Sequence, residues 1–341
     1  MKSFNEVFED KTKYGTKIKT SEYCEMGAHL IIDQGQEQVA GYTDIEEGVF
    51  EEVPVIIFGD HTRVIKYVDK PFFLGADGVK VLRSKFKNAN YKYLYYALKN
   101  ARIPNTGYNR HFKWLKEVQI EYPDYRRQEN VVKILDKVSD LIETRQHEIK
   151  RLDDLIKARF VEMFGDESNP LGWDVVNVED VATVQVGVVI KPAQYYTDAA
   201  NGVRAFRSLN IGSMYIKDND WVYFSEEGNS KNAKSILKEN DLIIVRSGAP
   251  GTACVVTKEY AGCNAIDIII AHPDMNKVNP YYLCAYTNLP HGKRQIDEGT
   301  GGAAQQHFNV GKYNKLQLML PPIEKQDEFV LFMEQVDKSK F

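Results

Sequence analysis

Hydrophobic and polar positions follow a β-type pattern over most of this 341-residue chain. In residues 1–123, and again in residues 166–321, short runs rich in Val, Ile and Phe, such as 53–58, are separated by turns containing Gly and Asp. One helix is predicted in each segment, at 91–100 and at 280–286. Each segment is therefore predicted to be a mixed α/β globule, in which strands and helices share one core.

Between the two globules the pattern changes to that of a long helix. Residues 129–164 contain neither Gly nor Pro, and their apolar side chains recur at spacings of four and three, which is the heptad period. Thirty-six helical residues span ~54 Å, and Gly165 is a helix stop. Arg145 and Arg159 interrupt the stripe, where they either pair with carboxylates across a helix interface or are solvated. The stripe residues predicted to pack against a second helix are Leu135, Val138, Ile142, Ile149, Leu152 and Ile156.

The two globules are predicted to be copies of one unit. The pair His111-Phe112 recurs 196 residues later as His307-Phe308, and the segment that begins at Gln128 recurs 198 residues later at Gln326. A period near 200 is far longer than the repeats of solenoid proteins, which reach ~50 residues. It indicates duplication of a whole domain together with the helix that follows it. Weaker matches in the same order pair Tyr93 with Tyr282, and residues 54–58 with residues 241–245.

The repeat also predicts a partner for the helical stripe. Residues 323–341 are the second copy of the helix start, and they place Phe329, Met333 and Val336 on the packing face. The predicted arrangement is an antiparallel coiled coil in which each helix leaves one globule and packs against the other. The second helix ends after about half the expected length, either because the sequence is cut short or because the natural helix is shorter. The predicted boundaries are 1–123 and 166–321 for the globules, and 124–165 and 322–341 for the helices.

Composition and charge narrow the range of functions. The chain has 44 Lys+Arg and 48 Asp+Glu, and its net charge of −4 argues mildly against non-specific nucleic-acid binding without excluding a basic patch. It has no apolar signal stretch at its start and no run of 18 uncharged apolar residues, so secretion and membrane spanning are not expected. Four cysteines without a C-x-x-C pair are typical of reduced thiols in a cytoplasmic protein. Seven scattered histidines show no metal-ligand spacing.

Two mixed α/β domains, each followed by a long helix with an apolar stripe, resemble the specificity subunit of type I restriction–modification systems. The motifs that carry the resemblance are residues 320–323 with Gln326, residues 122–123 with Gln128, residues 159–166, Gly172-Trp173, and the loops 58–63, 75–78 and 246–251. The resemblance covers essentially the whole chain, and the order of these motifs is more specific than any one of them.

The resemblance implies an α/β (α+β) architecture, with two similar target-recognition domains joined by long helices that pack as an antiparallel coiled coil. It further implies a subunit that is not itself an enzyme, in which each domain reads one half of a split, asymmetric DNA site. The implied partners are double-stranded DNA, two adenine-N6 methyltransferase subunits and, in addition, ATP-dependent restriction subunits. The implied cofactor, S-adenosylmethionine, belongs to the methyltransferase subunit, and none is expected in this chain.

Candidate DNA-binding residues follow from the chemistry of base and phosphate recognition. Arg reads guanine and Asn or Gln reads adenine, whereas Lys, Arg, hydroxyl groups and the backbone of Gly-rich loops hold phosphates. In the first domain the candidates are His61, Arg63, Asn109, Arg110 and His111. In the second domain they are Lys191, Arg207, Ser208, Lys231, Lys234, Arg246, Ser247, Thr300, Gly301, Gln305, Gln306 and His307. His111 and His307 are expected to orient their loops by hydrogen bonding rather than to act in chemistry.

Two other classes of function compete with DNA recognition. An enzyme would need a catalytic motif, but the Gly-rich stretches 248–251 and 299–302 match neither G-x-G-x-x-G nor a P-loop. Glu148 and Lys150 have a nuclease-like spacing, yet residues two apart on a helix point away from each other. A protein–protein assembly scaffold without direct sequence-specific DNA contact stays open, and the net charge fits it slightly better.

Overall fold

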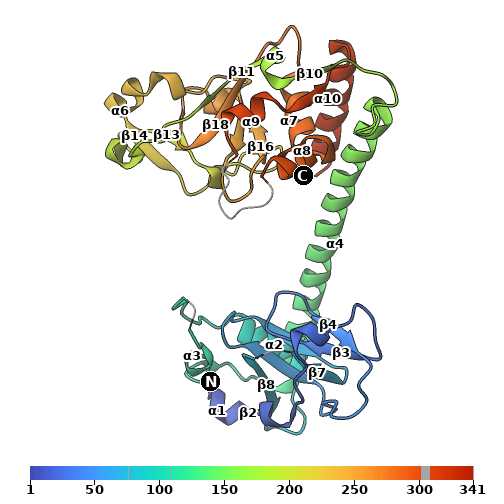
Figure 1. The fold of residues 1–341 in the computed structure, drawn as a ribbon. Coiled ribbons are helices and arrows are strands. Elements are labelled where there is room, and N and C mark those ends of the chain that lie inside the picture. The colour runs from blue at the N-terminus through green and yellow to red at the C-terminus, as the bar shows by residue number, and fades with distance from the viewer. Residues whose placement is uncertain (76, 108, 301–307, 341) are drawn as a thin grey trace. The chain divides into compact units, whose positions relative to one another are not determined.

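The structure, a computed structural model, describes residues 1–75, 77–107, 109–300 and 308–340. The chain divides into two compact units, unit 1 (Met1–Arg145) and unit 2 (Gln146–Phe341) (Figure 1). Helix α4 (Tyr125–Phe164) contributes residues to both. The arrangement within each unit is described separately below.

Unit 1 is organised around strand β5, whose five residues are all buried. Four strands form an antiparallel sheet in the order β2-β8-β5-β6, and a second sheet has the order β4-β3-β7. Ile56 and Phe58 of β5 share a core with Leu94 and Leu98 of helix α2. The elements are β1 (Lys2–Ser3), α1 (Phe4–Val7), β2 (Phe8–Asp10), β3 (His29–Ile32), β4 (Gly41–Thr43), β5 (Val55–Gly59), β6 (Ile65–Val68), β7 (Phe72–Leu74), β8 (Val79–Ser84), α2 (Tyr91–Lys99), α3 (Phe112–Leu115) and β9 (Gln119–Ile120), with 3₁₀ turns η1 (Thr12–Tyr14) and η2 (Thr20–Glu22).

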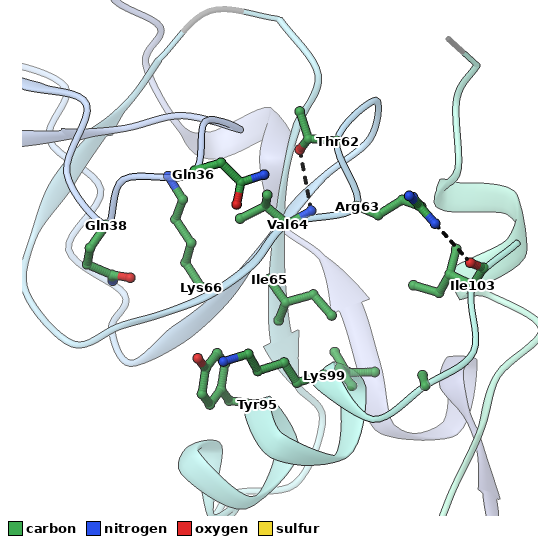
Figure 2. Close-up of a pocket in the computed structure, with 12 residues that line it drawn as sticks. Gln36, Gln38, Thr62, Arg63, Val64, Ile65, Lys66, Tyr95, Lys99 and Ile103 are labelled. Carbon is green, nitrogen blue, oxygen red and sulfur yellow. Dashed lines mark hydrogen bonds between the residues drawn. The ribbon is translucent and has the colours of Figure 1, made fainter. Parts of the chain in front are cut away.

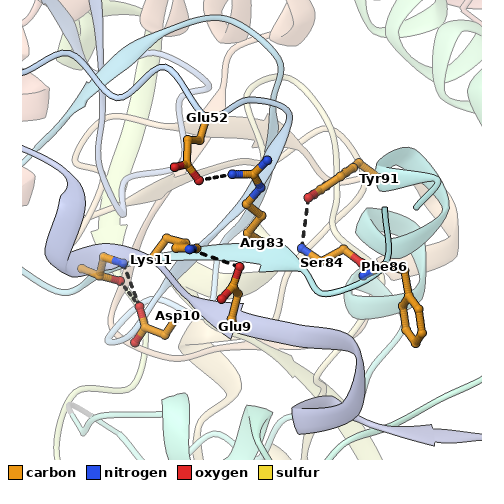
Figure 3. Close-up of polar contacts among 9 residues, drawn as sticks. Glu9, Asp10, Lys11, Glu52, Arg83, Ser84, Phe86 and Tyr91 are labelled. Atoms are coloured by element: carbon orange, nitrogen blue, oxygen red, sulfur yellow. Dashed lines mark hydrogen bonds and ion pairs between the residues drawn. The ribbon is translucent and has the colours of Figure 1, made fainter. Parts of the chain in front are cut away.

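Polar contacts on β8 tie the larger sheet of unit 1 to neighbouring segments (Figure 3). Arg83 forms an ion pair with Glu52, and the backbone N–H of Ser84 donates to the Tyr91 hydroxyl at 3.0 Å. Because Tyr91 is the first residue of α2, its bond to Ser84 fixes where that helix starts relative to the sheet.

Unit 2 contains the same kinds of sheet. Its larger sheet has the order β11-β18-β15-β16, its second sheet has the order β12-β14-β13-β17, and β10 pairs with β19. The elements are β10 (Val175–Asn177), α5 (Val178–Val181), β11 (Ala182–Val186), β12 (Tyr196–Thr197), β13 (Gly202–Phe206), β14 (Val222–Ser225), α6 (Glu226–Lys231), β15 (Leu242–Val245), β16 (Ala253–Val255), β17 (Asn264–Ala265), β18 (Ile268–Pro273), α7 (Pro280–Asn288), α8 (Pro290–Thr300), α9 (Val310–Asn314), β19 (Gln317–Met319) and α10 (Ile323–Lys338), with 3₁₀ turns η3 (Pro192–Tyr195), η4 (Ser208–Asn210), η5 (Ala233–Ser235) and η6 (Lys258–Tyr260).

Strand pairing confirms the predicted duplication. In unit 1, β3 pairs antiparallel with β4 and parallel with β7; in unit 2, β13 pairs antiparallel with β14 and parallel with β17. The first strand of each unit pairs with its last strand, as β1 with β9 and β10 with β19. The expected architecture of two similar mixed α/β domains is therefore correct.

Side-chain hydrogen bonds repeat between the units as well. The Tyr93 hydroxyl donates to the carbonyl of Glu121 at 2.8 Å, and the Tyr282 hydroxyl donates to the carbonyl of Met319 at the same distance. A buried amide turns the chain from the last strand into the following helix in both units. Gln128 donates to the carbonyl of Pro123 in unit 1, and Gln326 donates to that of Pro321 in unit 2, each at 2.8 Å. The residues that matched in sequence thus make the same contacts.

Helix α4 has 40 residues and confirms the predicted long helix. Its start is capped by Asp124, whose carboxylate accepts a bond from the N–H of Arg127 at 3.0 Å. It ends before Gly165, which has a φ of +86° and so provides the left-handed stop that a glycine adopts at low cost. Trp173 closes this end, because its indole N–H donates to the carbonyl of Phe164 at 3.1 Å. Within the described ranges, no helix combines the length and apolar character needed to cross a bilayer.

Helix α10 packs antiparallel to the last turns of α4 within unit 2. Arg159 approaches Glu328 at 3.5 Å, whereas Asp153, earlier on α4, pairs with Lys340, later in the chain, at 2.8 Å. The antiparallel direction is as predicted, and Arg159 pairs with a carboxylate across the two helices. Of the predicted packing residues, Ile156, Phe329, Met333 and Val336 are buried, and Leu135 and Leu152 are half-buried.

The packing predicted for three other stripe residues is corrected. Val138, Ile142 and Ile149 are 45%, 54% and 42% exposed. Helix α10 has 16 residues, or about 24 Å, and therefore covers only the C-terminal turns of α4. An apolar stripe remains exposed along the preceding turns.

Replacing Phe160 by Ala is expected to destabilise unit 2 by about 3–5 kcal/mol, because the fully buried ring leaves a cavity. Leu141→Ala, at a side chain that is 65% exposed on the same helix, should change the free energy of unfolding by less than about 0.5 kcal/mol. Urea unfolding followed by tryptophan fluorescence and circular dichroism measures both. Equal effects of the two substitutions would contradict the packing described for α4.

Candidate nucleic-acid interface

The two loops predicted to bind DNA in unit 1 lie together at the end of β5. Asp60, the first residue after the strand, accepts a backbone bond from His111 at 2.8 Å, and its carbonyl oxygen lies 3.0 Å from His111 Nδ1. The Asp60 carboxylate accepts the N–H of Phe112 at 2.7 Å. Asp60 and His111 are both buried. These bonds join the loop of residues 60–63 to that of residues 105–111.

Gln34 joins two further loops to this edge. Its backbone carbonyl accepts the Thr62 hydroxyl at 2.7 Å, its side-chain oxygen accepts the N–H of His61 at 3.1 Å, and its amide donates to the carbonyl of Asp77 at 2.9 Å. Gly78 lies next to the Gln34 amide with a φ of +94°, a backbone conformation that favours glycine. The loops that follow β3, β5 and β7 are thereby held as one surface. No sequence pattern singles out Gln34, because its partners are 27 to 43 residues away.

A polar pocket of about 490 Å³ adjoins these loops (Figure 2). Arg63 on its rim has a left-handed backbone, with φ of +62°, and donates to the carbonyl of Ile103 at 3.3 Å. Buried Lys66 donates to the carbonyl of Glu37 at 2.5 Å, and burial lowers its pKa although Asp33 opposes the shift. Most of the polar atoms come from Gln36, Gln38, Thr62, Arg63, Lys66, Tyr95 and Lys99.

The candidate residues of unit 1 differ in exposure. Asn109 and Arg110 are exposed, and His61 and Arg63 are half-buried. His111 is fully buried and cannot present its ring to a ligand at the surface, so its place among the DNA-contacting candidates is corrected. Its bonds to Asp60 are those of a residue that orients the loop, which is the role expected for it.

In unit 2, Arg246 directly follows the central strand β15, as Asp60 directly follows β5 in unit 1. Its backbone carbonyl accepts the N–H of Phe308 at 3.2 Å, and its Nε donates to the carbonyl of Phe308 at 3.4 Å. Its guanidinium forms an ion pair with Asp267, whose φ is +49°. Asp267 lies before β18 as Gly78 lies before β8. Arg246 is therefore held in place by its own loop, and Asp267 is a site residue that the sequence pattern did not reveal.

Three segments that carry candidates meet beside Arg246. The N–H of Ile266 donates to the carbonyl of Phe206 at 2.8 Å, and the N–H of Asp267 donates to that of Val188 at 3.1 Å. These bonds bring the loops that begin at residues 187 and 207 to the same edge as residue 246. Among the predicted side chains there, Lys191 is exposed, and Arg207, Ser208 and Ser247 are half-buried.

Lys231 and Lys234 are exposed on a different segment, formed by α6 and η5. Lys231 pairs with Glu227 at 2.6 Å, and this partner raises the pKa of its ammonium group. The backbone carbonyl of Lys234 accepts the side-chain amide of Gln185 at 2.6 Å. The predictions for the side chain of Thr300 and for Gly301, Gln305, Gln306 and His307 lie outside the described residues.

Comparison with known proteins identifies the family of the chain. The family model for the type I restriction modification DNA specificity domain matches residues 1–153 and 170–341. The chain belongs to this family. The resemblance inferred from the sequence is thus confirmed, and DNA recognition is the role of the family, whose specificity subunits are not catalytic.

Curated relatives in the family share modest identity with this specificity-domain chain. The specificity subunit of the type I restriction enzyme EcoR124I/EcoR124II from Escherichia coli is 29% identical over 147 residues, which are 39% of this chain and 36% of the relative. The MjaIX specificity subunit from Methanocaldococcus jannaschii is 20% identical over 227 residues, which are 61% of this chain and 51% of the relative. The matches span between about a third and a half of the relatives' length.

Solved structures show the same fold. The S subunit of the type I restriction–modification system from M. genitalium superposes with a TM-score of 0.57 at 15% identity, over 99% of this chain and 89% of that one. A second structure, from a study of complex assembly and conformational transition of the type I system, has a TM-score of 0.51 at 16% identity, over 99% and 90% of the two chains.

Asp60→Ala is expected to loosen the loop of residues 105–111, because it leaves the buried N–H of Phe112 without an acceptor, at a cost of about 1–3 kcal/mol. Asp60→Asn keeps an acceptor oxygen and should cost less. Hydrogen–deuterium exchange at the Phe112 amide, with urea unfolding of unit 1, compares the two. An alanine variant that exchanges as slowly as the asparagine variant would contradict the role given to Asp60.

Proposed function

We propose that each unit reads one half of a split, asymmetric DNA sequence, and that the chain positions adenine-N6 methyltransferase subunits on that sequence. The observation that carries the proposal is the residue after the central strand, which is acidic Asp60 in unit 1 and basic Arg246 in unit 2. The scaffolds match in strand pairing and hydrogen bonds, whereas the loops at this edge differ in charge and shape. Two domains that share a fold but have different loops at this edge should recognise different half-sites.

We propose further that α4 is the spacer between the half-sites. A helix of 40 residues is about 60 Å long, and one turn of DNA is ~34 Å. A rigid element of this length would leave base pairs between the half-sites unread. Its continuity supports the role, because neither Gly nor Pro interrupts it from residue 129 to residue 164.

The charge of the chain favours action within a complex. With 44 Lys+Arg against 48 Asp+Glu, the chain as a whole has no surplus of positive charge for DNA phosphates. We propose that methyltransferase subunits, which bind S-adenosylmethionine, supply part of the positive surface and all of the catalysis. ATP-dependent restriction subunits are the remaining proposed partners.

The half-site proposal is tested by expressing the chain with its methyltransferase partner in a methylation-free host and sequencing the methylated adenines. Wild type should give one bipartite, non-palindromic motif. Arg63→Ala should relax the sequence requirement at only one half of the motif, and Arg246→Ala at only the other half. Loss of a base-contacting side chain should cost about 1–3 kcal/mol of binding free energy. A continuous or palindromic motif, or a single substitution that relaxes both halves, would count against the proposal.

The competing function, an assembly scaffold without direct DNA contact, predicts a different salt response. If the units bind DNA, Lys191→Gln in the assembled complex should weaken binding to all DNA sequences by the same factor. It should also lower by about 1 the slope of the logarithm of the DNA-binding constant against the logarithm of the salt concentration. Lys315→Gln is the matched control, because Lys315 is paired with Glu179 beside the β10–β19 ribbon. Fluorescence titrations between about 50 and 200 mM salt measure both. Identical slopes for the two variants would favour the scaffold.

A further inference from the structure

Arg246 and Asp267 face each other at the end of the larger sheet of unit 2. The register of β15 and β18 places Val245 opposite Ile268, so the next residue outward on each strand belongs to this pair. The Asp267 carboxylate forms its ion pair with Nη1 of Arg246, and Nε of Arg246 donates to the carbonyl of Phe308 at 3.4 Å. Because two nitrogens of one planar group are held, the orientation of the guanidinium is restricted.

Asp267 is itself held in place by backbone bonds. Its N–H donates to the carbonyl of Val188 at 3.1 Å, and the N–H of Ile266 donates to the carbonyl of Phe206 at 2.8 Å. The side chain of Asp267 is 50% exposed, whereas that of Arg246 is 18% exposed. The carboxylate is thus a fixed acceptor at the rim of the site, and Arg246 is the more deeply buried partner.

The backbone of Asp267 is left-handed, with a φ of +49°. A side chain is disfavoured in this conformation, which glycine adopts at lower cost. In unit 1 the corresponding pair is Asp60 and Gly78, whose φ is +94°, because β5 and β8 pair in the equivalent register. A carboxylate at a position where glycine would cost less indicates a task for that carboxylate. Its partner in unit 2 is Arg246, and unit 1 has no arginine at the corresponding position.

The donors that remain on Arg246 suit one base. Arginine has five N–H donors in a fixed fork, and no residue in the described part of the chain accepts a hydrogen bond from Nη2 of Arg246. Guanine presents two neighbouring acceptors, O6 and N7, in the major groove, and an arginine fork fits both. A guanidinium that is held by Nε and Nη1, and that keeps the N–H groups of Nη2 for a ligand, therefore has the chemistry to read guanine.

We propose that Asp267 positions Arg246 to read a guanine, and thereby sets the base preference at one position of the half-site of unit 2. The inference rests on the proposed function, in which unit 2 reads one half-site. Asp267 acts through Arg246 and is a positioning residue. Without the carboxylate, the guanidinium turns about its side-chain torsions and also donates to the N7 of adenine or the O4 of thymine.

Loss of the carboxylate has two effects of opposite sign. Discrimination between bases falls, because the arginine fork is no longer restricted to one orientation. Affinity for DNA of any sequence is kept or rises, because a half-exposed negative charge beside the phosphates is removed. A residue with a merely structural role would lower both, since damage to the loop weakens every contact that unit 2 makes.

Asp267→Gly is the variant that tests this role. It removes the carboxylate and introduces the residue that the left-handed backbone favours, so it should fold as stably as the wild type in circular dichroism melts. Asn240→Gly is the matched control, because Asn240 has a φ of +70° at the opposite end of β15, and it should keep the wild-type base preference. Asp267→Asn keeps an acceptor oxygen and should retain part of the preference.

Base preference is measured for the chain assembled with its methyltransferase partner. Sequencing of methylated adenines in a methylation-free host gives the wild-type motif. Fluorescence titrations then use duplexes that carry this motif with each base pair of the half-sites replaced in turn.

Arg246→Ala should lose the guanine preference at one position. Asp267→Gly should lower the preference at that same position at least about fivefold, which is the lower end of what an arginine fork contributes. Duplexes with another base at this position should bind to Asp267→Gly as tightly as to the wild type or more tightly. The double variant Asp267→Gly/Arg246→Ala should match Arg246→Ala alone, because Asp267 acts only through Arg246.

The inference is overturned if Asp267→Gly keeps the wild-type preference, if its loss is spread over all positions of the half-site, or if Arg246→Ala keeps the full motif. A double variant that relaxes a position left intact by Arg246→Ala would also overturn it. In each of these results the wild type still gives a bipartite motif, so the half-site proposal stands. A wild-type motif that is continuous or palindromic would overturn both.

Discussion

A buried glutamine amide sets the direction in which the chain leaves the last strand of each unit. The start of the helix that follows depends on it. Gln326 donates to the carbonyls of Pro321 and Lys277 and accepts the N–H of Asn279, so it binds the last strand, the start of α10 and the cap of α7 together. Gln128 makes the corresponding bond to Pro123. A side chain that is both donor and acceptor, shielded from water, is costly to replace. The same residue at both strand-to-helix junctions accounts for helices that start alike in two otherwise divergent units.

Much of the scaffold could be predicted from the sequence, because buried features leave periodic or repeated signals. The heptad spacing from residue 129 to residue 164 corresponds to a single helix, and the matched pairs Tyr93/Tyr282 and Gln128/Gln326 make the same hydrogen bonds in both units. Strands of two or three residues, such as β1 and β10, are too short to show a period and were not predicted. The exposed part of the α4 stripe was predicted to be packed, because a heptad pattern records that a face binds something but not which element binds it.

The candidate interface was predictable only in part. Arg246 and the His111 loop are conspicuous because Arg, His and Gly cluster in turns. Gln34, which holds the neighbouring loop of residues 60–63, and Asp267, the partner of Arg246, are not conspicuous, because each acts through contacts with residues distant in sequence or through backbone geometry. The fold also shows that a candidate side chain can be occupied already: Arg246 is bound to Asp267, and His111 is bound to Asp60. Base-reading chemistry identifies residue types, whereas the loops decide which of them face solvent.

The crowding around Gln34 has a consequence for how unit 1 can change over evolutionary time. A Cβ at Gly59 would lie 2.2 Å from Thr62 Oγ1 and 2.9 Å from Gln34 Cβ, and Gly78, next to the Gln34 amide, has a φ of +94° that favours glycine. Three loops are therefore interlocked, and a single substitution at their bases is penalised unless a neighbouring loop changes with it. The sequence of unit 1 should therefore change at the tips of its loops, or by replacement of the whole unit. In unit 2 the corresponding edge is also constrained, because a Cβ at Gly187 would lie 2.4 Å from the backbone oxygen of Ala265 and Arg246 is paired with Asp267.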